Sequence, residues 1–270
     1  MNALENKGTI FVWRLYYIGL LTIALGAICA LISPIRFTIY KCLGFIYKVS
    51  INHSAITYGD SPLSPVSKRR LGMVKRKTLV LDMDETLITT VLDRNDTGME
   101  PLPEIPYDYS FYLEDYDYTF YVYKRPYVDL FLEKVSKWYD VTIYTAASQG
   151  YAEPVLDFLD AGRGILRKRL YRQHCIDVMG LRGKYVSLAN SDLANVLLVD
   201  NSDVECSFNA GNSVRIRSFR VGRQDEALLN LLPFLDALRF TSDVRTVLER
   251  CTRYDCLTTA IERSCQDNSF

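Results

Sequence analysis

Apolar residues gather in three short uninterrupted runs, and each run ends in polar side chains. The runs are Thr78–Asp82 (TLVLD), Val141–Thr145 (VTIYT) and Asn195–Asp200 (NVLLVD). Continuous apolar runs of this length are typical of strands that are buried on both faces of a parallel sheet. We therefore expect three parallel strands whose carboxyl ends carry aspartate, threonine and asparagine side chains.

A helical spacing of apolar residues marks the segments between and after these runs. The four predicted helices are Val128–Trp138, Tyr151–Leu159, Glu226–Arg239 and Asp243–Arg253. Alternating strands and helices predict an α/β fold with a doubly wound parallel sheet. Residues 107–123 alternate aromatic and acidic side chains, which predicts a small β insertion. We expect its aromatic rings to pack within the sheet rather than to contact substrate.

An uncharged apolar run near the N-terminus, Leu15–Ile32, predicts an N-terminal membrane anchor helix. Its length fits the ~17–25 residues that cross a bilayer, and Trp13, Tyr16 and Tyr17 lie where interfacial aromatics are found. A non-basic start and the lack of an A-x-A site favour an uncleaved anchor over a signal peptide. The following residues 35–48 have a broad apolar face suited to an in-plane helix. Spanning is therefore favoured, and a monotopic anchor stays open, as does a buried core helix.

Charge is segregated along the chain, although 32 basic residues balance 32 acidic ones overall. Residues 34–77, here called the basic neck, contain nine Lys or Arg and one Asp. Positive flanks stay on the cytosolic side and attract anionic lipids, so an anionic membrane surface is an expected partner.

These patterns divide the chain into four parts. We predict an anchor at 1–33, an amphipathic segment and basic linker at 34–77, a catalytic domain at 78–253 and a tail at 254–270.

Composition excludes several classes of protein. With 49% hydrophobic and 24% charged residues, the chain is neither disordered nor of low complexity. Its seven scattered cysteines lack a CxxC pair and it has only two histidines. These counts argue against a disulfide framework and a structural zinc site.

The strongest chemical signal is the pair of carboxylates in Asp82-Met83-Asp84-Glu85-Thr86. A lone DxD motif is weak evidence, because many surface turns contain one. Here it follows a predicted buried strand directly, and ligands of open α/β sheets bind at the carboxyl ends of strands. The pattern predicts two carboxylates that point into one crevice.

These features resemble the phosphatases of the haloacid dehalogenase superfamily, in the branch related to the RNA polymerase II C-terminal-domain phosphatases. Within that branch the chain is most similar to the membrane-anchored nuclear envelope members. The resemblance is carried by SPLSPVSKRRLGMVKRKTLVLDMDETLI (61–88), YKRPYVDLFLEKVSKWYDVTIYTAAS (123–148), LRKRLYRQHC (166–175), VLLVDNS (196–202) and EALLNLLPFLDALRFTSDVRTVLER (226–250).

The resemblance implies a role for each polar side chain at the strand ends. Asp82 is the nucleophile that becomes an aspartyl phosphate, and Asp84 protonates the leaving oxygen and then activates water. Mg²⁺ is held by Asp82, the backbone carbonyl of Asp84 and Asn201, with Asp200 beside them. Thr145 and a lysine hold the phosphoryl oxygens.

The lysine is assigned by spacing. Counting forward from Cys175 or backward from Asp192 places Lys184 on the family lysine without a gap. Arg182 is the alternative candidate for this role. Lys184 would then be a solvated lysine in a loop, without a function in the site. The chain departs from the family pattern at Thr89, Asp203 and Gly222, where the family has histidine, proline and an acid. None of these changes removes a reacting group, so they bear on substrate preference and regulation and only weakly on activity. His174, Cys175 and Cys206 are expected to be structural.

The resemblance also implies a location and partners. Nuclear envelope members act at the endoplasmic reticulum and nuclear envelope with a small membrane regulatory subunit, and they dephosphorylate lipin-type phosphatidate phosphatases. We therefore predict a membrane-anchored, Mg²⁺-dependent protein serine/threonine phosphatase with a phosphoprotein substrate and no nucleic-acid partner. The alternatives are a soluble phosphatase for the polymerase tail, which the apolar N-terminus opposes, and a scaffold with a degenerate cleft, which the intact motif residues oppose.

Overall fold

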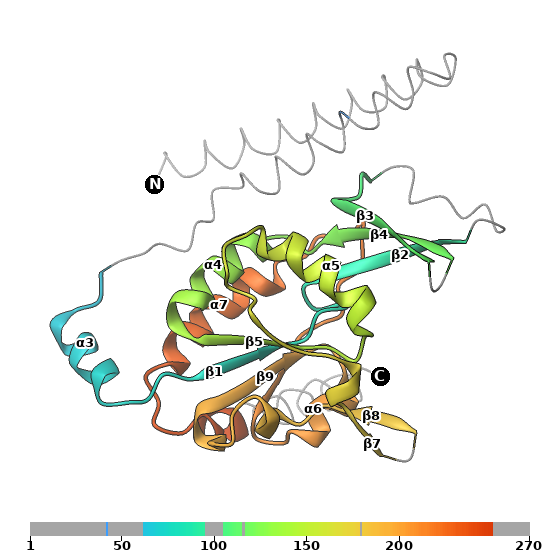
Figure 1. The fold of residues 1–270 in the computed structure, drawn as a ribbon. Coiled ribbons are helices and arrows are strands. Elements are labelled where there is room, and N and C mark those ends of the chain that lie inside the picture. Colours follow the sequence, from blue (N-terminus) through green and yellow to red (C-terminus); the bar gives the residue numbers. More distant parts are fainter. Residues whose placement is uncertain (1–41, 43–61, 95–104, 115–116, 179, 251–270) are drawn as a thin grey trace, which may run out of the picture. The chain divides into compact units, whose positions relative to one another are not determined.

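The computed structural model describes residues 42, 62–94, 105–114, 117–178 and 180–250 (Figure 1). The predicted anchor, the basic neck up to residue 61 except Cys42, and the tail lie outside these residues. None of the helices within the described ranges has the length and apolar character needed to cross a membrane.

A five-stranded parallel sheet forms the centre of the catalytic region. Its order is β10 (Ser213–Arg215), β9 (Val196–Asp200), β1 (Thr78–Leu81), β5 (Asp140–Tyr144) and β6 (Lys168–Leu170). The pairing register places Leu81 opposite both Ile143 and Val199, so the three predicted strands are neighbours that end at one level. The prediction of an α/β fold with a parallel sheet is confirmed.

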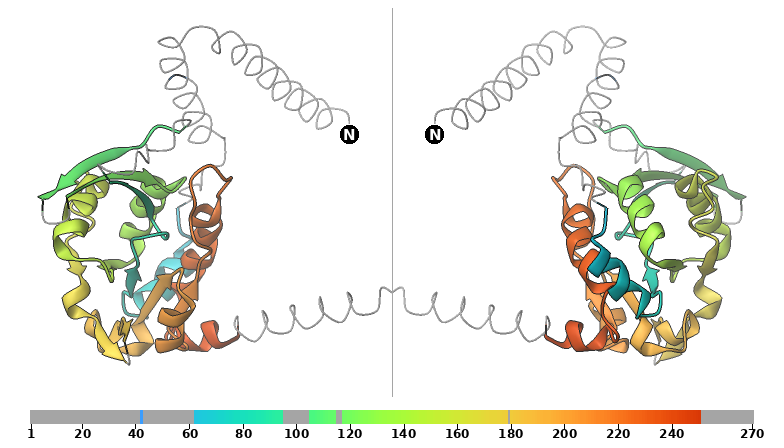
Figure 2. Two further views of the ribbon diagram at one scale, coloured as in Figure 1. Left: turned by 90° about the vertical axis from the view of Figure 1, so that its right-hand side faces the viewer. Right: turned by 90° about the vertical axis from the view of Figure 1, so that its left-hand side faces the viewer.

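Alternate residues of β1 pack on opposite faces of the sheet, as strand geometry requires. Leu79 and Leu81 belong to the larger apolar core, and Val80 packs on the other face with Val186 and Leu198. Three helices cover the larger core and contribute buried residues to it (Figures 1 and 2). They are α4 (Val128–Trp138), α5 (Gln149–Asp160) and α7 (Ala227–Leu238). The other face carries α6 (Asp203–Phe208), which contacts β9 and β10. Residues 245–250 form a further helical segment within the predicted last helix.

The predicted β insertion is a three-stranded antiparallel sheet in the order β2 (Ile88–Arg94), β4 (Tyr118–Lys124), β3 (Tyr109–Leu113). Strand β2 lies outside the predicted insertion. The aromatic rings pack together as expected, with Phe111 and Phe120 stacked at 5.2 Å between ring centroids. Phe120 also lies 5.0 Å from the ring of Tyr151, which places the insertion against α5.

Several short elements were not predicted. Helix α3 (Pro65–Gly72) lies in the segment interpreted as a linker; Ser64 caps it by accepting from the Ser67 N–H at 3.1 Å, and Pro65 occupies its first position. The remaining short elements are β7 (Ile176–Val178), β8 (Leu181–Gly183), η2 (Arg172–His174), η3 (Val186–Leu188) and η4 (Leu193–Asn195).

Candidate active site

Asp82 and Asp84 leave strand β1 on the same side. The Asp82 N–H donates to the Val199 carbonyl at 3.0 Å, which extends the pairing of β1 with β9 by one residue. Met83 between the two carboxylates is completely buried in the core. Glu85 has a left-handed backbone with φ of 58°, and the chain turns there into β2. Both carboxylates consequently reach one cavity of about 750 Å³.

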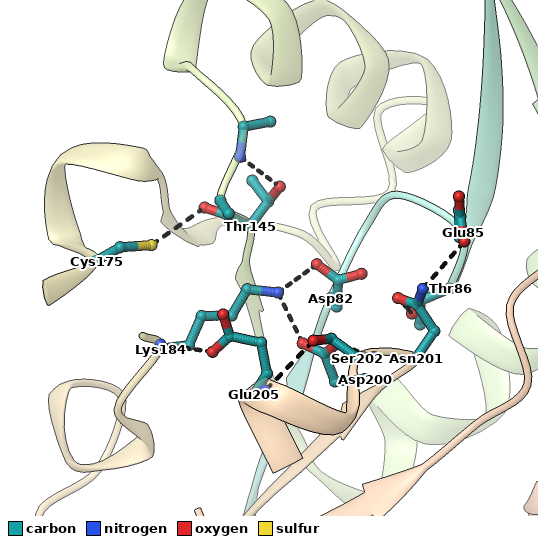
Figure 3. A network of polar contacts seen from close by, with 12 residues as sticks. Asp82, Glu85, Thr86, Thr145, Cys175, Lys184, Asp200, Asn201, Ser202 and Glu205 are labelled. Carbon is teal, nitrogen blue, oxygen red and sulfur yellow. Dashed lines mark hydrogen bonds and ion pairs between the residues drawn. The ribbon is translucent and has the colours of Figure 1, made fainter. Parts of the chain in front are cut away.

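Every side chain that the sequence predicted for the site lines this cavity. Figure 3 labels all of them except Asp84. The lining of the cavity includes the carboxyl ends of three neighbouring parallel strands and the loop after β8. The predicted residues that line it are Asp82, Asp84, Thr145, Lys184, Asp200 and Asn201. Segments more than one hundred positions apart in the chain therefore meet in one place.

Lys184 lies between two carboxylates. Its Nζ donates to Asp82 Oδ1 at 2.5 Å and to Asp200 Oδ2 at 2.7 Å, and its side chain is 3% exposed. Burial disfavours the ammonium, but the two carboxylates outweigh burial and raise the pKa of Lys184. Burial raises the pKa of the Asp82 carboxyl, and Lys184 opposes that shift. Arg182, the alternative cation, is exposed on β8.

Asp84 has different neighbours. The Tyr151 hydroxyl donates to Asp84 Oδ1 at 2.7 Å, and the Thr90 hydroxyl lies 2.6 Å from the same phenol oxygen. Because the single phenolic proton is directed at Asp84, Thr90 is the donor of the second bond. Burial raises the pKa of Asp84, and the bond from Tyr151 partly offsets that rise. A carboxyl group with a raised pKa in a cavity is suited to donate and accept protons.

The turn after β9 presents Asn201 with a fixed orientation. Its Oδ1 accepts from the Thr86 hydroxyl at 3.2 Å, and its Nδ2 donates to Ser218 Oγ at 3.0 Å and Glu85 Oε2 at 3.2 Å. Asp200 Oδ1 accepts from the Ser202 N–H at 2.8 Å. The amide oxygen of Asn201 is thereby turned toward the DxDET loop.

Residues 77–245 match the family described as NLI interacting factor-like phosphatase. The chain belongs to this phosphatase family. It is 45% identical to CTD nuclear envelope phosphatase 1 of Xenopus tropicalis over 204 residues, 74% of this chain and 82% of the relative. It is 41% identical to the CTD nuclear envelope phosphatase 1 homolog of Drosophila melanogaster over 242 residues, 86% of this chain and 96% of that relative.

Among solved structures, the RNA polymerase II CTD phosphatase Fcp1 matches with a TM-score of 0.45 and 22% identity, over 64% of this chain and 53% of that one. With the family established, the chain is a protein phosphatase of the haloacid dehalogenase type.

The donor atoms of the NLI interacting factor-like site fit a hard divalent cation. Asp82, Asp84 and Asn201 offer oxygen ligands, which Mg²⁺ prefers. Five acids line this cavity beside two basic residues, Lys184 and Arg172, so a bound cation would balance part of the excess negative charge. Within the described ranges no group of three or more His, Cys, Asp or Glu side chains is arranged to hold a metal. The predicted set differs from such a group because it includes an amide and a backbone carbonyl.

Thr145 directly follows β5 and is almost completely buried, and its Oγ1 accepts from the Ala147 N–H at 3.0 Å. The turn that follows is held by Arg172, whose Nε donates to the Ala146 carbonyl at 2.9 Å and which also lines the cavity. Arg172 was not singled out from the sequence, although it lies in the basic run LRKRLYR. His174 accepts from the Tyr171 N–H at 2.9 Å, which agrees with the structural role expected of it.

A buried ion pair supports the DxDET loop from behind. Arg125 donates to Asp225 Oδ1 and Oδ2, both at 2.9 Å, and the two side chains are 0% and 3% exposed. The same guanidinium donates to the carbonyls of Thr86 at 3.0 Å and Arg217 at 2.7 Å. Sequence reasoning gave no role to Arg125 or Asp225, although Arg125 lies in the stretch 123–148 that carries the family resemblance.

Proposed function

We propose that this family member is a membrane-anchored, Mg²⁺-dependent protein serine/threonine phosphatase that acts through an aspartyl phosphate on Asp82. The observation that carries the proposal is the contact of one buried lysine, Lys184, with Asp82 and Asp200 in the cavity that also holds Asp84 and Thr145.

The proposed reaction has two half-reactions. In the first, an Asp82 oxygen attacks phosphorus, the bond from phosphorus to the serine or threonine oxygen breaks, and Asp84 gives that oxygen a proton. In the second, the Asp84 carboxylate takes a proton from water, whose oxygen attacks phosphorus and releases Asp82 and inorganic phosphate. The hydrogen bond from Tyr151 orients Asp84 for both transfers.

The phosphoryl group carries negative charge that the site must balance. Lys184 supplies one positive charge, and the Thr145 hydroxyl supplies a hydrogen bond. Bound Mg²⁺, held by Asp82, the Asp84 carbonyl and Asn201 with Asp200 beside them, would let an anionic carboxylate approach an anionic phosphate. These assignments follow the family roles and are supported by the shared cavity.

We further propose that residues 1–33 anchor the catalytic region of 78–253 to the endoplasmic reticulum and nuclear envelope, through the linker at 34–77. The apolar run and the basic neck support this, as do relatives named nuclear envelope phosphatase. A lipin-type substrate and a small membrane regulatory subunit rest on the family resemblance. Cell fractionation tests the location, since a soluble polymerase-tail phosphatase would be absent from the membrane fraction.

Turnover of a phosphoserine peptide by the full chain in detergent tests the chemistry. We expect activity with Mg²⁺, none after EDTA, and recovery when Mg²⁺ is restored. Asp82→Asn should abolish turnover while the protein still folds, because an amide cannot attack phosphorus. Mg²⁺-dependent turnover by Asp82→Asn would contradict the mechanism.

A further inference from the structure

Glu205 is a buried acid that the reaction does not use directly. It lies in the first turn of α6, directly after the Asp200–Asn201 turn, and is 7% exposed. Its Oε2 accepts from the Lys184 N–H at 2.7 Å (Figure 3). The carboxylate therefore holds the backbone of the residue whose ammonium meets Asp82.

The start of α6 explains why this carboxylate is available. Ser202 and Glu205 stand at the N-cap and third positions of a capping box, in which the glutamate would accept from the N-cap N–H. Ser202 Oγ does accept from the Glu205 N–H at 3.3 Å. The Ser202 N–H, however, donates to Asp200 Oδ1 at 2.8 Å. Only the first of the two capping-box hydrogen bonds is formed, so the Glu205 carboxylate accepts from the Lys184 N–H instead.

The last turn of the same helix holds the other side of Lys184. Asn209, which caps α6, donates from Nδ2 to the Lys184 carbonyl at 2.7 Å and to the Glu205 carbonyl at 2.9 Å. Its Oδ1 accepts from the Val186 N–H at 3.0 Å. The N–H and the carbonyl of Lys184 are thus both fixed by side chains from one short helix.

We propose that Glu205 is a positioning residue that sets the Lys184 ammonium against the phosphoryl group. The proposal rests on the function proposed above, in which Lys184 binds that group. A lysine side chain has a flexible four-carbon stem, so its head is placed only as well as its backbone is held. Helix α6 joins that backbone to the turn carrying Asp200 and Asn201, so the lysine and the proposed cation ligands are positioned together.

Steady-state kinetics of the full chain with Mg²⁺ and a phosphoserine peptide test this role. Glu205→Met removes the acceptor and keeps an unbranched side chain, and it should lower kcat/KM by up to about 100-fold, the effect of a roughly 1 Å misplacement. Glu205→Gln retains an acceptor oxygen and should restore activity close to that of the unaltered chain. Wild-type activity in Glu205→Met, or equal loss in Glu205→Gln, would overturn the proposal.

Asp203→Ala is the matched control. Asp203 is another acid in the first turn of α6, but it is exposed and pairs with Arg215 at 2.8 Å. Its loss should leave kcat/KM unchanged, whereas a general weakening of α6 would affect both variants. Thermal unfolding of each protein checks the fold, and Glu205→Ala repeats the comparison where methionine does not fit.

A double-mutant cycle separates positioning from structure. If Glu205 acts through Lys184, Glu205→Met should cause no further loss of kcat/KM in a Lys184→Ala background. An additive loss would overturn the positioning role. Full activity of Lys184→Ala alone would overturn the proposed phosphoryl contact and this inference with it. A strong defect in Lys184→Ala beside an active Glu205→Met would overturn this inference only.

Discussion

Two aspartates separated by one residue have different surroundings and, in the proposed reaction, different tasks. Burial raises the pKa of both carboxyl groups, but Asp82 also faces the Lys184 ammonium, which opposes that rise and suits a nucleophile. Asp84 faces the Tyr151 hydroxyl and has a pKa raised by burial, which suits a group that exchanges protons. Environments that separate the properties of two carboxyl groups are a general means of dividing acid and nucleophile roles.

Tyr151→Phe should change the pH dependence of turnover. A hydrogen bond to the ionised carboxylate lowers its pKa, so removing the Tyr151 hydroxyl should raise the pKa of Asp84 further. The alkaline limb of the kcat/KM profile should move to higher pH. At neutral pH we expect a loss of at most roughly tenfold, the value of one hydrogen bond.

The matched control for this variant is Tyr139→Phe, which removes a buried hydroxyl bonded to the Leu235 carbonyl at 2.6 Å. It should leave the profile unchanged. An identical profile for Tyr151→Phe and the unaltered chain would contradict the role given to Tyr151.

Lys184→Ala and Arg182→Ala should differ strongly, although the residues are close in sequence. Lys184 is buried against two aspartates, and Arg182 is exposed on β8. Removing one preorganised group that stabilises charge costs about 10²–10³-fold in kcat. We expect a loss of that order for Lys184→Ala and little change for Arg182→Ala in the same peptide assay. The reverse order would mean that the phosphoryl cation is misassigned.

The sequence contains enough information to find some of these residues and not others. Asp82 and Asn201 follow recognisable strands, and fixed spacing locates Lys184. Tyr151 and Glu205 have no such marker in the sequence. Tyr151 bonds to Asp84, 67 positions away, and Glu205 bonds to Lys184, 21 positions away. Their roles depend on the tertiary packing of α5 and α6.

At the scale of elements, predictability followed the length and apolarity of each segment. Strands β1 and β9 are buried at every position, so their apolar runs were clear. Strands β6 and β10 have three residues each, which is too short for a periodic pattern. Helix α3 has no buried residue and therefore no apolar face, so its segment was interpreted as a linker.

The Arg125–Asp225 ion pair joins elements that the sheet alone does not connect. Arg125 follows β4, Asp225 precedes α7, and their contacts reach the DxDET loop after β1. Asp225→Ala would leave a buried guanidinium without its carboxylate. We expect the free energy of unfolding to fall by about 3–5 kcal/mol.

Denaturant unfolding of the full chain measures this loss. Asp203→Ala, which removes an exposed partner of Arg215, should cost at most about 1 kcal/mol and serves as the control. Equal losses in the two variants would show that the buried pair adds nothing beyond a surface contact.

At the scale of the whole molecule, the proposed anchor and the basic neck predict on which side of the membrane the catalytic region lies. Helix α3 extends the basic neck into the described structure and exposes Lys68, Arg69 and Arg70. Each well-placed cation near an anionic surface contributes roughly 1 kcal/mol to attachment. A neck of this charge favours a cytosolic position for everything that follows it.

Two glycosylation sequons test that position. Asn52-His53-Ser54 and Asn95-Asp96-Thr97 both follow the apolar run, so both would be lumenal if the catalytic region were lumenal. The basic neck predicts the opposite side, where glycosylation does not occur and where phosphoproteins are available. We therefore expect both asparagines to be unmodified in the full chain expressed in cells. Glycosidase treatment followed by electrophoresis measures this, with an Asn52→Gln, Asn95→Gln double variant as the control. A glycosidase-sensitive shift that the double variant lacks would reverse the topology, and a lumenal catalytic region would have no access to a cytosolic phosphoprotein.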